Sequence, residues 1–213
     1  MTADDRARAV HRVAAVALAY PDAELAADLP EMRELAAGDR HLPAFLDHCA
    51  ATPLAELAAH YTEVFDFRAR RCLYLTWWRD GDTRRRGVAL VAFKEAYRAH
   101  GLEFTGGGEL PDFLPAVLHF TATTGDTSLL DEHRAGLELL RLSLEDCGTP
   151  YARVLQAVCA TLPGPSPKDR AAAMQMARNG PPREDVGLEP YGATPLPMPG
   201  FPAPEPLPAG DPR

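Results

Sequence analysis

The sequence has few of the patterns that mark catalytic or metal-binding proteins. Its 213 residues include four cysteines, Cys49, Cys72, Cys147 and Cys159, whose spacing forms neither a CxxC motif nor a zinc-ligand pair. The seven histidines form no HExxH motif and no helix-spaced pair suited to a metal. We therefore expect no metal, no cofactor and no catalytic residue, and we expect the cysteines to be buried as small hydrophobic side chains.

Long apolar runs are also missing. No stretch approaches the ~20 apolar residues that a membrane-spanning helix needs, so direct membrane insertion is not expected. The first ten residues, MTADDRARAV, lack the apolar core of a signal peptide, which favours a reduced, cytoplasmic protein. The formal net charge is -8, whereas a nucleic-acid-binding protein is usually basic. We therefore expect no nucleic-acid partner.

Proline is scarce in the first three quarters of the chain and frequent afterwards. Seven of the 21 prolines precede Pro163, and the other fourteen lie from Pro163 onward. Hydrophobic residues make up 46% of the chain, which is enough to bury a core. We predict one folded domain over residues 1–162 and a proline-rich, mostly disordered tail over 163–213. Within that tail, residues 168–179 have the composition of a short helix.

Apolar residues recur at helical spacing through most of the folded part. Thr52 followed by Pro53 is a typical helix start, with the threonine as N-cap. Asp82 is placed to cap another helix, whose predicted inward residues are Val88, Val91, Ala92 and Tyr97, flanked by Leu90 and Phe93. The predicted helical segments are 4–20, 23–37, 41–50, 54–67, 83–100, 110–121, 127–146 and 151–162.

Residues 72–79, CLYLTWWR, are the one segment whose composition also suits a β-strand. We predict a helix there, because no other segment with an alternating pattern is present to pair with it. The sequence therefore predicts an all-α fold, a single compact helical bundle domain of about seven to nine helices.

Aromatic and basic side chains gather in the stretch 61–120. Trp77 and Trp78 are adjacent and point about 100° apart on a helix, so both cannot be fully buried. Either one is simply a partly exposed core residue, or it lines a groove for a partner's apolar side chains. Arg84 and Arg86 belong to an arginine cluster, which is either a solvated helix face or a surface that attracts an anionic partner or a nucleotide.

Other residues of this stretch also have two interpretations. Asp112 either stabilises the start of the helix over 110–121 or accepts a hydrogen bond from a bound peptide. His119 is either a residue at the edge of the core or a ligand-contacting side chain. Tyr61 and Phe65 are either core residues or the wall of a groove.

Several motifs in this stretch resemble a known family. They are Tyr61-x3-Phe65-Asp66, the run LYLTWW, Gly81-Asp82-Thr83-Arg84-x-Arg86-Gly87 and Leu110-Pro111-Asp112-x-Leu114-Pro115. The chain resembles the nitrate reductase molybdenum cofactor assembly chaperones, NarJ, of the wider TorD/DmsD group of redox enzyme maturation proteins. The likeness covers roughly residues 8–160 and is strong over 61–120.

This resemblance implies a TorD-like, all-helical cytoplasmic chaperone that is not an enzyme. Its implied partner is the catalytic (alpha) subunit of respiratory nitrate reductase, whose N-terminal peptide it would bind before molybdenum cofactor insertion and membrane docking. We expect a monomer or weak dimer. The family often has histidine after the Pro-Asp pair, whereas this chain has Phe113, which makes the groove more apolar.

From the residues and the resemblance together, a groove formed by aromatic side chains beside a basic rim is predicted to bind the peptide. The predicted peptide-binding residues are Tyr61, Phe65, Tyr74, Trp77, Trp78, Arg84, Arg86, Asp112, Phe113, Pro115 and His119. The alternatives are a maturation chaperone for a different molybdoenzyme, or a nucleotide-binding helical protein that uses the arginine cluster.

Overall fold

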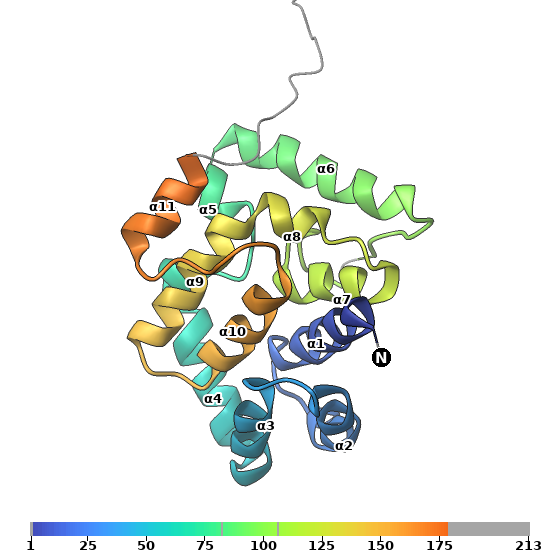
Figure 1. The fold of residues 1–213 in the computed structure, drawn as a ribbon, viewed down its shortest axis with the longest axis vertical. Helices are drawn as coiled ribbons and strands as arrows, with labels where there is room; N and C mark the ends of the chain where they lie inside the picture. The colour runs from blue at the N-terminus through green and yellow to red at the C-terminus, as the bar shows by residue number, and fades with distance from the viewer. Residues whose placement is uncertain (1, 82, 106, 179–213) are drawn as a thin grey trace, which may run out of the picture. The chain divides into compact units, whose positions relative to one another are not determined.

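The computed structural model describes residues 2–81, 83–105 and 107–178, whose helices are shown in Figure 1. In these residues the chain forms no β-strand apart from one isolated bridge, so the all-α prediction is confirmed. The eleven helices exceed the predicted number, partly because α5 and α8 have only four and five residues. The elements are α1 (Ala3–Ala17), α2 (Leu25–Ala36), α3 (Leu42–Ala51), α4 (Leu54–Phe65), the 3-10 helix η1 (Ala69–Arg71), α5 (Trp77–Asp80), α6 (Arg84–Ala99), α7 (Leu114–Thr124), α8 (Ser128–Glu132), α9 (Arg134–Asp146), α10 (Tyr151–Thr161) and α11 (Arg170–Arg178).

Helix α1 is central to the packing. Its start is fixed by a capping box in which Thr2 and Asp5 exchange hydrogen bonds of 3.0 and 2.9 Å. Its inner face is small, with Val10, Val13 and Ala14 buried, so neighbouring helices approach closely. Helices α2, α7 and α10 pack against it, and α9 packs on α10 (Figure 1).

The predicted leucine stripe over 127–146 is confirmed, because Leu130, Leu137, Leu140 and Leu144 are all fully buried or nearly so. The prediction of one continuous helix is wrong. The backbone leaves helical geometry at His133, with φ -101° and ψ 14°, and this residue separates α8 from α9. The predicted inward face of α10 is confirmed as well.

Of the four inward residues predicted for the helix over 83–100, Tyr97 is confirmed, whereas the prediction is wrong for Val88, Val91 and Ala92, which are exposed. Val88 and Val91 are 75% and 52% exposed, whereas Ala89, Phe93 and Tyr97 are buried. The three buried residues recur every four positions, so they lie on one face of α6. Two aromatic rings bury more apolar surface than two valines, so the face that carries Phe93 and Tyr97 is the inner one.

The helix predicted over 72–79 is present only at its end, as α5. Before it, Tyr74 forms an antiparallel bridge with Phe113, and Leu75 and Thr76 form the turn that leads into α5. The backbone N–H of Leu75 donates to the Asp112 carbonyl at 3.0 Å, and that of Leu114 donates to the Leu73 carbonyl at 2.8 Å. The same pairing delays the start of α7 from the predicted residue 110 to Leu114.

Two predicted helix caps have different outcomes. Thr52 does not cap α4; its hydroxyl donates to the His48 carbonyl at 2.8 Å and so closes the end of α3. Asp82, the other predicted cap, lies outside the described residues. The cysteines also differ from expectation, since Cys49 and Cys159 are buried but Cys147 is exposed.

Residues after the predicted boundary at 162 also pack onto the helices, since α11 contacts α9. Glu138 of α9 is fully buried between Arg134 and Arg141, at 3.2 and 2.6 Å. Both arginines also donate to backbone carbonyls of this segment, those of Pro163, Gly164 and Pro167. The expected short helix over 168–179 is present as α11. The predicted disorder from residue 180 onward lies outside the described residues. The division of the chain into a domain and a tail stays a prediction.

Candidate functional site

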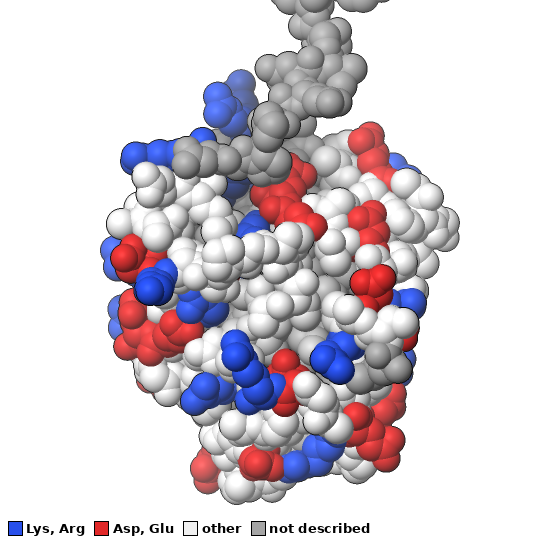
Figure 2. Space-filling view, in the orientation of Figure 1, with Lys and Arg blue, Asp and Glu red and all other residues white. Residues whose placement is uncertain are grey.

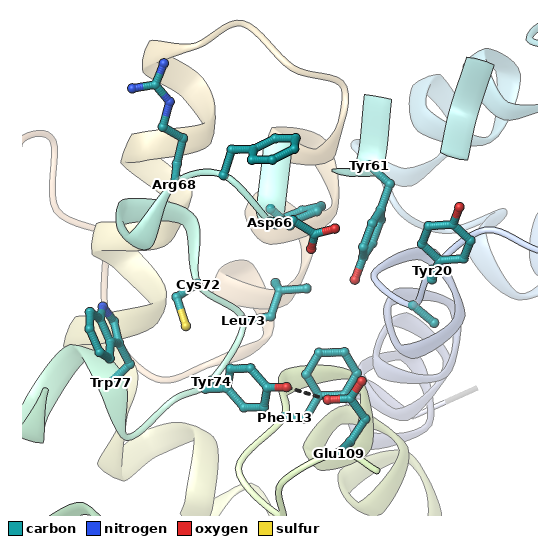
Figure 3. A pocket seen from close by; sticks show the side chains of 13 residues that line it. Tyr20, Tyr61, Asp66, Arg68, Cys72, Leu73, Tyr74, Trp77, Glu109 and Phe113 are labelled. Carbon is teal, nitrogen blue, oxygen red and sulfur yellow. Dashed lines mark hydrogen bonds between the residues drawn. The ribbon is translucent and has the colours of Figure 1, made fainter. Parts of the chain in front are cut away.

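A hollow of about 760 Å³ opens where the end of α1, the end of α4 and the bridged segment before α5 meet. Figure 3 shows Tyr61, Tyr74, Phe113 and Glu109 directed toward one another, with Arg68 and Trp77 at the edge of this group. We call it the aromatic pocket, because seven of its thirteen lining residues are aromatic. It is lined by Ala19, Tyr20, Tyr61, Phe65, Asp66, Phe67, Arg68, Cys72, Leu73, Tyr74, Trp77, Glu109 and Phe113.

One wall of the aromatic pocket is formed by rings from α4 and from the residues after α1. Tyr61 packs edge-on against Tyr20 and tilted against Phe65, with ring centroids 5.4 and 4.8 Å apart. The Tyr61 hydroxyl donates to the Leu18 carbonyl at 3.1 Å, which ties α4 to α1. Burial raises the pKa of the Tyr61 phenol, so this wall is neutral at physiological pH.

The opposite wall comes from the bridged segments. The rings of Tyr74 and Phe113 are 5.4 Å apart, and the Tyr74 hydroxyl donates to the Glu109 carboxylate at 2.5 Å (Figure 3). Burial and this carboxylate raise the pKa of Tyr74. The guanidinium of Arg86 lies 5.6 Å from the centre of the Tyr74 ring, which stabilises the ring by a cation–π interaction.

Behind that wall, Asp112 holds the bridged segment in place. Its carboxylate is fully buried and accepts hydrogen bonds from the backbone N–H and the hydroxyl of Thr76, at 3.1 and 2.5 Å. The Thr76 hydroxyl in turn accepts a 3.2 Å hydrogen bond from Arg86. Asp112 is therefore a structural residue of the wall rather than a group that faces the pocket.

The mouth of the pocket exposes apolar surface beside charges of both signs. Phe67 is 74% exposed and Tyr20 is 57% exposed. Asp66, Glu109 and Arg68 also line the hollow, so two carboxylates and one guanidinium lie beside the rings. Such a surface can bury a partner's apolar side chains and orient a basic side chain among them.

The structure brings five of the predicted binding residues together in this pocket: Tyr61, Phe65, Tyr74, Trp77 and Phe113. Pro115 and His119 instead line a separate hollow of about 280 Å³. Trp78 lies against Gly136 of α9 and donates its ring N–H to the Cys72 carbonyl at 3.0 Å. Arg84 is exposed on α6, Arg86 contacts the Tyr74 ring, and Asp112 is buried.

Sequence reasoning missed several pocket residues, notably Tyr20, Phe67, Arg68 and Glu109. Phe67 and Arg68 directly follow α4, so their closeness to Phe65 in the chain was an available signal. Tyr20 and Glu109 come from distant parts of the sequence and gave no local signal. In the described residues, no three His, Cys, Asp or Glu side chains converge as a metal site requires. None of the helices described combines the length and the apolar composition of a membrane span.

Comparison with known proteins places the chain in a family. The family described as nitrate reductase delta subunit matches residues 21–157, a range that contains the aromatic pocket except Ala19 and Tyr20. The Bacillus subtilis nitrate reductase molybdenum cofactor assembly chaperone NarJ is 32% identical over 154 residues, which cover 68% of this chain and 83% of that protein. The Escherichia coli K12 chaperone NarJ is 35% identical over 113 residues, covering 49% of this chain and 48% of that one.

A third relative is much longer than the segment that it has in common with this chain. The nitrate reductase-like protein NarX of Mycobacterium tuberculosis H37Rv is 42% identical over 114 residues, which are 52% of this chain but 17% of NarX. A crystal structure of a candidate redox enzyme maturation protein from Archaeoglobus fulgidus has the same fold, with a TM-score of 0.57 and 21% identity, over 72% of this chain and 91% of that one. The chain belongs to the nitrate reductase delta subunit family, together with the NarJ molybdenum cofactor assembly chaperones.

Proposed function

We propose that this chain is a non-catalytic assembly chaperone for a respiratory nitrate reductase. In this proposal it binds the N-terminal segment of the catalytic subunit in the cytoplasm, before the molybdenum cofactor is inserted and the enzyme docks at the membrane. Membership of the family supports the enzyme system, because two relatives are named as nitrate reductase molybdenum cofactor assembly chaperones. The aromatic pocket supports the mode of action.

The observation that carries this proposal is the apolar surface at the mouth of the aromatic pocket. A phenylalanine that is 74% exposed leaves apolar area in water, and its position beside six other aromatic linings suggests that a partner covers it. An amphipathic peptide helix can lay its apolar face into such a groove. Aromatic residues are frequent among the side chains that carry most of the binding energy.

The charges of the pocket favour a peptide with a basic side chain. Asp66 and Glu109 place two carboxylates at the lining, against the single guanidinium of Arg68. A lysine or arginine of the bound segment would contact both the rings and a carboxylate. The basic rim that the sequence suggested contributes less, because Arg79 is already paired with Asp80 and Glu132, at 3.1 and 2.5 Å.

The nucleotide-binding alternative has less support for the same reason. Arg79 is committed to those ion pairs and Arg86 lies against Tyr74. Arg84 is exposed on α6, whereas Arg68 lies in the loop between α4 and η1. On the face of the molecule in Figure 2, acidic and basic side chains are interspersed rather than gathered into a basic stripe. A nucleic-acid-binding surface would need such a stripe.

Calorimetric titration with a synthetic peptide of the catalytic subunit's first residues tests the proposal. We expect micromolar affinity, about -8 kcal/mol, because a chaperone must release its client. Phe67→Ala and Trp77→Ala should each raise the Kd about fivefold or more, since each removes an aromatic contact of about 1 kcal/mol. Met174→Ala is the matched control: this residue is 51% exposed on α11, away from the pocket, and its removal should leave the Kd unchanged.

Two results would count against pocket binding. The first is the absence of saturable binding at high micromolar peptide. The second is an equal loss of affinity in Met174→Ala, which would mean that the aromatic variants act through general destabilisation. In cells, loss of the chain should leave the reductase without its molybdenum cofactor.

A further inference from the structure

The outer face of α6 is the most exposed apolar helix surface in the described part of the chain. Val88 is 75% exposed and Val91 is 52% exposed, on a helix whose opposite face buries Phe93 and Tyr97. Figure 1 shows α6 at the periphery of the fold. No residue of α6 lines the aromatic pocket, so a contact at this face would be separate from the pocket.

Four side chains form a narrow stripe along this face. With 100° between successive residues of an α-helix, Arg84, Val88, Val91 and Glu95 lie within about 60° of one another. Two valines are at the middle, an arginine is at one end and a glutamate is at the other. Among the described residues, neither Arg84 nor Glu95 takes part in an ion pair, so both charges are available to a partner.

This stripe is complementary to itself when two copies run antiparallel. Val88 and Val91 are equally far from the midpoint of the stripe, and so are Arg84 and Glu95. A twofold axis through that midpoint places Val88 opposite the partner's Val91 and Arg84 opposite the partner's Glu95. Because the arrangement is twofold, each pair occurs twice.

The remainder of the helix permits this contact. Gly87 lies beside the stripe, and a side chain added there would meet no atom within 4 Å, so the surface is open at that point. Arg85 and Lys94 project to opposite flanks of the helix at 100° per residue, so they do not meet across the antiparallel pair. Like charges therefore do not oppose one another at the centre.

We propose that this face is the contact between two copies of the chain in a weak antiparallel homodimer formed through α6. Stable protein complexes bury at least ~1,200 Å² of surface, and two valines from each copy fall well short of that. The dimer is therefore transient, with a dimerisation Kd in the high-micromolar range. It leaves the aromatic pocket free, so it is independent of peptide binding.

Sedimentation velocity of the full chain from ten to several hundred micromolar tests the proposal. The wild type should change from monomer to dimer over this range. Val91→Asp should raise the dimerisation Kd at least tenfold, because it places two carboxylates in the apolar centre. Met174→Asp introduces the same charge at an exposed apolar position of α11 and should leave the Kd unchanged.

A charge exchange tests the antiparallel register itself. Arg84→Glu alone and Glu95→Arg alone should each be monomeric, because every pair then has like charges. An equimolar mixture of the two variants should dimerise as well as the wild type, since each glutamate then meets an arginine. A wild type that stays monomeric at all concentrations would overturn the proposal. So would a mixture that fails to associate, or a dimer that Val91→Asp does not weaken.

Discussion

Asp112 determines the position of one pocket wall without entering the pocket. Its carboxylate accepts both polar hydrogens of Thr76, in a place that water does not reach. Asp112→Ala should therefore lower the free energy of unfolding by about 3 kcal/mol, because buried donors are left without acceptors. Urea denaturation measures this loss.

The loss should depend on Thr76. In a Thr76→Val background one of the two donors is already gone, so Asp112→Ala should cost measurably less there. Glu63→Ala, which removes an exposed carboxylate from α4, provides the comparison and should change stability by under ~0.5 kcal/mol. An Asp112→Ala protein as stable as the Glu63→Ala protein would contradict this role.

His11 makes the stability of the fold depend on pH. Its two ring nitrogens hydrogen-bond to the hydroxyls of Thr121 and Thr161, at 3.0 and 2.7 Å, and burial lowers its pKa to about 4 from 6.5. Between pH 6.5 and about 4, His11 is protonated in the unfolded chain but neutral in the folded chain. The free energy of unfolding therefore falls as the pH falls through this range.

The size of this effect can be measured above the range in which carboxylates titrate. From pH 7 to pH 5 the free energy of unfolding should fall by about 2 kcal/mol through His11. His11→Gln should reduce the fall by this amount, whereas His119→Gln, at an exposed histidine of α7, should leave it unchanged. Burial also lowers the pKa of His41, His48 and His133, so a smaller slope remains in His11→Gln. A wild-type slope in His11→Gln would show that other groups are responsible.

At the scale of single helices, Trp78 and Gly136 join α5 to α9. A Cβ atom on Gly136 would lie 2.7 Å from the Trp78 Cβ, closer than such atoms approach. Gly136→Ala should therefore destabilise the protein by about 1–3 kcal/mol, although alanine favours a helix more than glycine does. It should also weaken peptide binding, because a shift of α5 moves Trp77 away from the pocket.

The matched substitution is Gly87→Ala in α6, where the added Cβ meets no atom within 4 Å. This change should stabilise the protein by up to ~1 kcal/mol through helix propensity alone. Thermal denaturation of both variants at low micromolar concentration separates the two effects. If both glycine substitutions stabilise, the contact between Trp78 and Gly136 is looser than described.

The helices also show where sequence patterns suffice. The faces of α9 and α10 follow from their own apolar repeats, because leucine and valine stripes there have no competing face. On α6 the prediction is right for Tyr97, but Phe93, which was predicted to flank the inner face, is buried there, and Val88 and Val91 are exposed. The bridged residues before α5 were not predictable locally, since their hydrogen-bonding partner, the segment around Phe113, is distant in the sequence.

At the scale of the whole molecule, residues 163–178 complete the core rather than extend from it. Arg134 and Arg141 hold the segment through backbone carbonyls, and Ala173 of α11 is fully buried. A chain that ends at Leu162 would leave these guanidinium groups without those acceptors. Its free energy of unfolding should be at least about 3 kcal/mol lower than that of a chain that ends at Arg178. Equal urea midpoints for the two truncated chains would contradict a stabilising role of residues 163–178.

The aromatic pocket was predictable only in part, for the same reason of distance. Tyr61, Phe65 and Trp77 stood out as aromatic residues in one stretch of sequence, whereas Tyr20 and Glu109 reach the pocket through the packing of α1 and the loop before α7. Trp78 looked equivalent to Trp77, but one helical step of 100° directs it to α9 instead. Peptide binding by these residues stays a prediction.

The residues that line the pocket come from distant parts of the sequence, so the pocket can form only late in translation. Tyr20 is held in place by α1, and α1 rests on α10, whose last residue is Thr161. Translation must therefore pass residue 161 before the hollow can form. The proposed function then implies that completed copies, and not nascent ones, bind the client, so they should be made before the enzyme.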